Sequence, residues 1–153
     1  METLLLSIFS LLCSFFALGF SVRTHRESVA HDRKQATLDA YNQLQEQVLD
    51  KLYTYKPAYI REIAKDKCSE EYKIISTYIA RIEHFCVGIE EDIYDMETMY
   101  KLSHGFFDAS IKYRIMPIIE LKNRDSKEYY INTLNVLEKM EVRSKKWYLQ
   151  ERD

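Results

Sequence analysis

The side chains most able to do chemistry gather near the middle of the chain. Carboxylates, an imidazole and a thiol occur close together, at Glu83, His84, Cys86, Glu90 and Glu91. Such groups are common ligands of transition metals, and a carboxylate beside a histidine can also transfer protons. If these side chains converged in the folded protein, they would support a metal-dependent or carboxylate-dependent enzyme.

A second candidate pair is His104 and Asp108, which are four residues apart and would share one helix face. A metal site would need further ligands from another helix. The chain contains neither HExxH nor the paired ExxH pattern of di-metal bundles. We therefore interpret both groups as solvated surface charges, and the sequence assigns no metal-ligating and no cofactor-binding residue.

Sites for a nucleophile or a nucleotide are also disfavoured. Cys86 falls on an apolar helix face, where a cysteine is usually a small buried hydrophobe, and no GxSxG motif occurs. The isolated Gly88 and Gly105 form neither a GxGxxG loop nor a P-loop. Cys13 lies in an apolar stretch, and Cys68 and Cys86 show no CxxC or Cys/His ligand spacing. The sequence indicates no catalytic residue and favours a chain that is not an enzyme.

The composition predicts helices. Of 153 residues, 46% are hydrophobic and 30% are charged, whereas only three are Gly and two are Pro. So little turn material disfavours an all-β fold. The formal net charge of −2 provides no basic surface, so we expect no nucleic-acid partner.

An apolar segment occupies the N-terminus. Leu4 to Val22 contains 19 residues without a charge, which as a helix would span about 28 Å, close to the thickness of a bilayer's hydrocarbon core. A cleaved signal peptide is the alternative, but Glu2 stands where positive charge is usual, and Ala17-Leu18-Gly19 lies inside the apolar run. We predict a transmembrane anchor over residues 1–22, with the lipid bilayer as its partner.

Positive charge flanks the apolar segment on one side. Arg23, His25 and Arg26 follow it at once, with Arg33 and Lys34 shortly after, and no Lys or Arg precedes it. By the positive-inside rule, the N-terminus would lie outside the inner (plasma) membrane and the C-terminal domain in the cytoplasm. Unpaired cysteines agree with a reducing compartment.

Behind the anchor we expect a polar helical stalk over residues 23–37 and a helical domain over residues 38–150. No Gly or Pro lies between Gly19 and Pro57, so the first helix can run unbroken into the stalk. The stripe that follows is too short for a coiled coil and predicts a helix packed on its own domain. Its members are Leu38, Tyr41, Leu44, Val48, Leu52 and Tyr55.

Local signals place two helices in the first half of the domain. Pro57 opens a short helix over Ala58–Ala64, and Ser69 caps a central helix over Glu70–Tyr94. Because Gly88 lowers helix propensity, we expect it to face another helix closely, either the one from Met96 or the Leu38–Leu52 stripe. The inner face of the central helix would be Ile75, Tyr78, Ile79, Ile82, Phe85, Cys86, Ile89 and Ile93.

Two more helices are predicted toward the C-terminus. Asp95 caps the first, whose inner stripe would be Met99, Leu102, Phe106, Ala109 and Tyr113. Pro117 should kink or end it. Asp125 and Glu128 resemble a capping box for the last helix, whose apolar face would be Tyr130, Leu134, Leu137, Met140 and Trp147. The predicted fold class is all-α, with one N-terminal transmembrane helix followed by a small cytoplasmic helical bundle.

Two segments carry a resemblance to a known family. Arg81–Asp95 reads RIEHFCVGIEEDIYD, and a later helix ends in IMPIIELKNR at Ile115–Arg124. Together they resemble the bacterial membrane-anchored family catalogued as domain of unknown function 4760, through Glu83-x3-Val87-Gly88-Ile89 and through Pro117-Ile118-Ile119 with Arg124. The likeness would cover about Thr37 to Trp147. It implies the architecture above and a bacterial or phage origin, with no activity or catalytic residue.

Three functions stay open. The leading hypothesis is a single-pass membrane protein whose cytoplasmic helical domain mediates protein–protein interaction or self-association, because the chain combines an anchor with no catalytic constellation. The second is a metal- or carboxylate-dependent membrane-associated enzyme or effector built on the charged groups described above. The third is a membrane-active toxic or regulatory small protein, in which the serine-bearing first helix is the effector.

Overall fold

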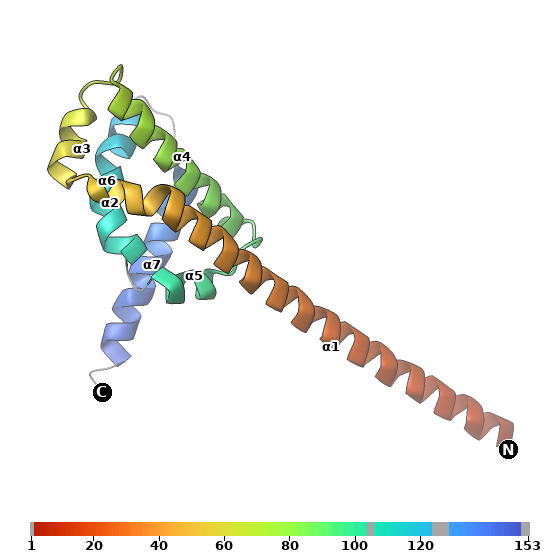
Figure 1. Cartoon of the computed structure of the whole chain (residues 1–153). Helices are drawn as coiled ribbons and strands as arrows, with labels where there is room; N and C mark the ends of the chain where they lie inside the picture. Colours follow the sequence, from red (N-terminus) through yellow and green to blue (C-terminus); the bar gives the residue numbers. More distant parts are fainter. Residues whose placement is uncertain (1, 104–105, 124–128, 151–153) are drawn as a thin grey trace.

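One long helix leads into a bundle of shorter helices (Figure 1). The computed structural model describes residues 2–103, 106–123 and 129–150, and the side chains of residues 9–103, 107, 111–123 and 129–143. Within these residues every regular element is helical and no strand occurs. The prediction of an all-α chain is confirmed.

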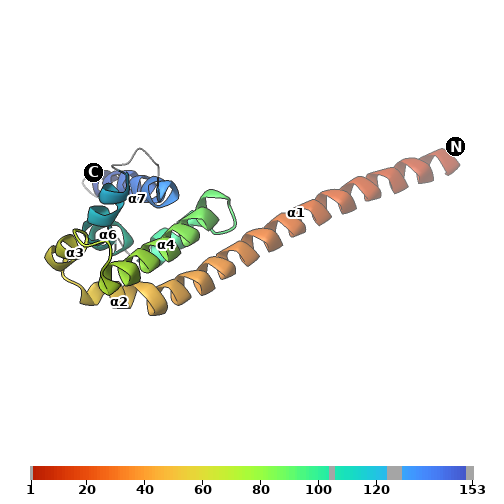
Figure 2. The same cartoon turned by 90° about the horizontal axis from the view of Figure 1, so that it is seen from above.

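Helix α1 (Glu2–Leu44) joins the apolar segment to the polar stalk without a break, as predicted. Its N-terminal half stands clear of the domain in two perpendicular views (Figures 1 and 2). All side chains of residues 9–32 are exposed, including large apolar ones at Phe9, Leu11, Leu12, Phe15, Phe16, Leu18, Phe20 and Val22. Among the side chains that the structure describes, no helical stretch is long and apolar enough to cross a bilayer.

The C-terminal part of α1 packs on the domain, and this prediction is confirmed. Contact begins near Arg33, and Thr37, Tyr41 and Leu44 are buried. The helix continues as a π-helical turn (Gln45–Leu49), closed by the N–H of Asp50 donating to the carbonyl of Gln45, and then as α2 (Asp50–Thr54). Because the π-turn adds one residue to the helical repeat, the adjacent Val48 and Leu49 both face the core.

Helices α3 (Pro57–Ile63) and α4 (Glu70–Glu90) begin where the sequence predicts. Pro57 opens α3, where its missing N–H has no intrahelical partner to lose. Ser69 caps α4, with its hydroxyl oxygen accepting from the N–H of Tyr72 at 3.2 Å.

The predicted end of α4 is wrong. The helix stops at Glu90 rather than Tyr94, and Ile93, expected on the inner face, is 59% exposed. Asp92 adopts a left-handed conformation with φ of 58°, and the N–H groups of Ile93 and Tyr94 both donate to the carbonyl of Gly88 at 2.9 Å. This reversal satisfies helix-end carbonyls and turns the chain back, so the apolar periodicity no longer describes a helix.

Helix α5 (Met96–Ser103) has the predicted cap, since Oδ1 of Asp95 accepts from the N–H of Thr98 at 2.8 Å. The single helix expected from here through Tyr113 is wrong, because α5 ends at Ser103 and α6 (Phe106–Asn123) begins anew. Because α6 starts again, its positions face other directions than a continuous helix would give, and Tyr113 is 64% exposed. The buried face of α6 is Phe107, Ile111, Ile115, Ile118 and Ile119, and the side chains of Phe106 and Ala109 lie outside the described residues.

Pro117 does not end its helix, because α6 continues to Asn123. A proline inside a helix has no N–H to donate to the carbonyl four residues earlier, here that of Tyr113. Because Tyr113 is exposed, water can hydrogen-bond near this carbonyl, which lowers the free-energy cost of the missing helical hydrogen bond.

Helix α7 (Ile131–Gln150) completes the bundle. Asp125 and Glu128, the predicted capping box, and the side chain of Trp147 lie outside the described residues. Leu137 and Met140 are buried as predicted, Leu134 and Tyr130 are half-buried, and Thr133 and Val136 complete the inner face. Helix α4 contacts both α1 and α7, which fits its predicted place in the core, while α3 packs on α6 (Figure 2).

Candidate functional site

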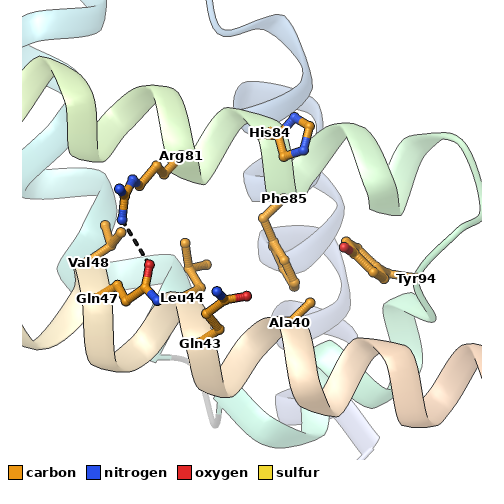
Figure 3. Close-up of a pocket in the computed structure, with 9 residues that line it drawn as sticks. All are labelled: Ala40, Gln43, Leu44, Gln47, Val48, Arg81, His84, Phe85 and Tyr94. Atoms are coloured by element: carbon orange, nitrogen blue, oxygen red, sulfur yellow. Dashed lines mark hydrogen bonds between the residues drawn. The ribbon is translucent and has the colours of Figure 1, made fainter.

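A groove of about 230 Å³ lies between α4 and the C-terminal part of α1 (Figure 3). Its walls come from segments that are adjacent only because these two helices pack side by side. Its lining residues are Ala40, Gln43, Leu44, Gln47, Val48, Arg81, His84, Phe85 and Tyr94.

The inner part of the groove is apolar and well fixed. Phe85 packs edge-on against Tyr41, with ring centroids 6.2 Å apart, and stacks on Tyr94 at 5.2 Å. Leu44 and Val48 are 6% and 1% exposed, so they form a firm base beside these rings. Aromatic pairs of this kind add stability beyond area burial, and they hold this wall in one geometry.

Polar side chains form the rim. Nη1 of Arg81 donates to Oε1 of Gln47 at 2.9 Å across the mouth of the groove, and Gln43 and His84 are exposed beside it (Figure 3). A guanidinium has five N–H donors in a rigid plane, so this contact leaves donors available while it fixes the orientation. A carboxylate or a backbone carbonyl is the matching acceptor.

The π-turn of α1 contributes directly to this rim. Gln47 and Val48 lie within Gln45–Leu49, where Gln47 is at the mouth while Val48 and Leu49 are buried. Such turns are rare, and they are often found at functional sites. The part of the chain that faces Arg81 is therefore the π-helical turn directly after α1.

The chemistry of the groove follows from the groups that line it. Among its lining residues there is no carboxylate and no thiol or aliphatic hydroxyl, and arginine does not lose its proton in proteins. His84 is the one imidazole among the lining residues, and no other lining residue orients it as a base. The arrangement can bind an apolar group next to a hydrogen-bond acceptor.

Glu83, the first residue of the predicted charged cluster, points to the opposite side of α4. Its Oε1 accepts from the backbone N–H of Asn132 at 3.2 Å and from the Asn132 side chain at 2.7 Å. Its Oε2 accepts from the backbone N–H of Thr133 at 2.8 Å and from the Thr133 hydroxyl at 2.7 Å. A helix start leaves N–H groups unpaired and carries positive partial charge, so Glu83 caps α7 from another helix.

The other members of the cluster are dispersed. Oε1 of Glu90 pairs with Nζ of Lys139 at 2.7 Å, Glu91 is exposed, and His84 lies at the groove. Cys86 is fully buried, and loss of hydration raises the pKa of its thiol far above the usual value. Glu83 and Glu90 therefore join α4 to α7, and the carboxylates of this cluster do not form a common site.

The second candidate pair is His104 and Asp108. His104 and the side chain of Asp108 lie outside the described residues. Within the part of the chain that the structure describes, no group of three or more His, Cys, Asp or Glu side chains is arranged to hold a metal ion.

Gly88 is closely packed, but its neighbour is not a helix as predicted. A Cβ at this position would overlap Cδ2 and Cε2 of Tyr94, in the loop before α5. The same loop donates two N–H groups to the Gly88 carbonyl. Gly88 therefore lets Tyr94 lie against α4 and reach Phe85 at the end of the groove.

Sequence reasoning missed the groove. Gln43 and Gln47 border the apolar stripe at i, i+4 spacing, which is the one local signal of a polar rim on that face. Arg81 and Tyr94 join them only through the packing of α4 on α1, and no spacing along the chain encodes that contact.

A family description, Domain of unknown function (DUF4760), matches residues 3–140. This chain belongs to the DUF4760 family. The match begins before Thr37, where the resemblance was expected to start, so the DUF4760 region includes most of α1 as well as the domain. No curated protein and no solved structure matches the chain.

Proposed function

We propose that this DUF4760 protein is a single-pass membrane protein of bacterial or phage origin, whose helical domain binds a protein partner at the groove between α1 and α4. One observation supports the membrane anchor. Large apolar side chains from Phe9 to Val22 are exposed on a helix segment that stands clear of the domain (Figures 1 and 2). Burying each such side chain is favourable by about 1.5–3 kcal/mol, so the segment requires an apolar cover.

Lipid is a better cover than one partner helix. Leu11 and Phe20 are nine residues apart, which is two and a half turns, so they lie on opposite faces, and they are 59% and 73% exposed. A helix that is apolar all round is typical of a membrane span, whereas a dimer would leave one face in water. The span proposed from the sequence, Leu4 to Val22, starts before the first described side chain.

The charges that follow this span support the orientation. Arg23, Arg26, Arg33 and Lys34 all come after it, so we place the N-terminus outside and the domain in the cytoplasm, at the inner membrane.

The groove supports recognition of a protein segment. An apolar side chain of the partner would lie on Leu44, Val48 and Phe85, and a carboxylate or carbonyl of the same segment would accept from Arg81. Charge-assisted hydrogen bonds of this kind are about twice as strong as neutral ones and fix orientation. A second copy of this chain is the alternative partner. Crosslinking would then give a dimer with twice the mass of the 18.3 kDa chain.

Site-specific photocrosslinking in bacterial membranes tests this function. A benzophenone amino acid at Gln43, on the rim, should give a discrete adduct, whereas the same group at the exposed Lys67 should not. Arg81→Gln should abolish the adduct, and Arg61→Gln, an equal charge change on α3, should leave it. Absence of an adduct at Gln43, or equal adducts at both positions, would contradict docking at the groove.

A further inference from the structure

A basic notch lies where α1 leaves the domain. It measures about 360 Å³ and is lined by His25, Arg26, Val29, Ala30, Arg33, Lys34 and Asp95. All but Asp95 belong to the stalk part of α1, directly after the apolar segment. We propose that this notch binds the phosphate of anionic phospholipid headgroups, with Arg26 as the main contact. The inference rests on the proposed anchoring of α1.

The notch faces the space between membrane and domain. Arg26 and Arg33 are seven residues apart and share a helix face with Thr37, which is buried against the domain. The hydroxyl of Thr37 accepts from the N–H of Asp95 at 2.7 Å, so the loop before α5 forms the far wall. A headgroup at Arg26 would therefore lie beneath the domain rather than on the outer side of the stalk.

Depth selects His25 and Arg26 as the headgroup contacts. At 1.5 Å per residue they lie about 5–6 Å beyond Val22, and the headgroup layer is roughly 5–7 Å thick on each side of the hydrocarbon core. Arg33 and Lys34 lie about 17–18 Å beyond Val22, outside that layer. At this distance salt screens most of their attraction to a charged surface.

Local ion pairs select Arg26 further. Arg33 lies 3.4 Å from a carboxylate oxygen of Asp92, and Arg23 pairs with Glu27 at 2.9 Å. Lys34 lies close enough to Asp95 to help lower the pKa of that carboxyl. Among the described residues, no carboxylate pairs with Arg26, which therefore has its whole charge and its donors available for a phosphate.

Native mass spectrometry of the full chain in mild detergent tests this site, with phosphatidylglycerol and phosphatidylcholine of equal acyl chains as probes. The wild-type protein should retain phosphatidylglycerol preferentially. Arg26→Gln should weaken that preference about fivefold, the effect of one basic residue near an anionic surface. Lys34→Gln should weaken it less, and the matched control Arg61→Gln should not change it. Equal preference in Arg26→Gln and Arg61→Gln, or no preference in the wild type, would overturn the proposal.

A parallel measurement separates this failure from failure of the anchor. The full chain is reconstituted with phosphatidylcholine vesicles and floated after an alkaline carbonate wash. Flotation of both wild type and Arg26→Gln, combined with no lipid preference, refutes the headgroup site alone. If the wild-type chain does not float, the anchor itself is wrong.

Discussion

Replacement of Gly88 by alanine probes the most tightly packed point near the groove. Gly88 is buried in α4, and a methyl group there would overlap the ring of Tyr94. That ring cannot move freely, because it stacks on Phe85 at 5.2 Å and because the N–H of Tyr94 is bound to the Gly88 carbonyl at 2.9 Å. The added methyl must therefore displace an ordered aromatic side chain.

Two opposing effects set the magnitude. Alanine gains about 1 kcal/mol of helix propensity over glycine, while overpacking a fixed site costs about 1–3 kcal/mol. The net effect of Gly88→Ala should be a loss of about 1 kcal/mol. For a domain of this size, that loss lowers Tm by roughly 4 °C.

A double-mutant cycle in the full chain, followed by thermal unfolding in mild detergent, isolates the cause. Tyr94→Ala removes the ring that the methyl would meet, so Gly88→Ala should raise Tm in that background by several degrees. The sign of the effect should therefore reverse between the two backgrounds. If Gly88→Ala raised Tm with Tyr94 present, or lowered it equally in both backgrounds, the packing assigned to this loop would be wrong.

Three further predictions follow from the contacts of α4 and α5. Glu83→Ala should lower the free energy of unfolding in urea by about 2 kcal/mol, because it removes the cap of α7. The control Glu91→Ala should change that free energy by no more than about 0.5 kcal/mol. Equal losses in the two variants would refute the capping role. In the folded chain a maleimide should modify exposed Cys68 and spare buried Cys86 until denaturant is added, and early labelling of Cys86 would contradict its burial. Partial burial acts to raise the pKa of Asp95, but hydrogen bonds from Thr98 and the nearby Lys34 and Arg33 outweigh it and lower that pKa. The stability that Asp95 contributes is complete above its ordinary pKa of 3.8 and is lost as pH falls through the lowered value. Asp95→Asn should therefore make stability fall less steeply with pH below about pH 4. An unchanged dependence of stability on pH in this variant would refute the prediction.

Local signals in the sequence were sufficient for several elements. Ser69 and Asp95 cap helices as predicted because a capping side chain acts on N–H groups only two or three residues away. The stripe through Tyr41, Leu44 and Val48 packs inward because one apolar face leaves a helix few alternatives.

The wrong predictions have non-local causes. Ile93 keeps the periodicity of α4, but the chain reverses before it, held by the Gly88 carbonyl and by Thr37 of α1. Tyr113 does not face the core as predicted, because the chain breaks between α5 and α6 and the periodicity of α5 does not continue into α6. From the sequence, Glu83 can be interpreted only as a surface charge or a ligand, because its role depends on the packing of α7 on α4. The groove likewise depends on the packing of α4 on α1.

Labelling of Cys68 in a bacterial host tests the membrane-anchored account most directly. Cys68 is exposed in the loop just before α4, so a membrane-impermeant maleimide reports the side on which the domain lies. The account predicts full-length chain in the membrane fraction, with Cys68 unmodified in intact spheroplasts and modified after lysis. Recovery of the chain in the soluble fraction, or modification of Cys68 in intact spheroplasts, would contradict it.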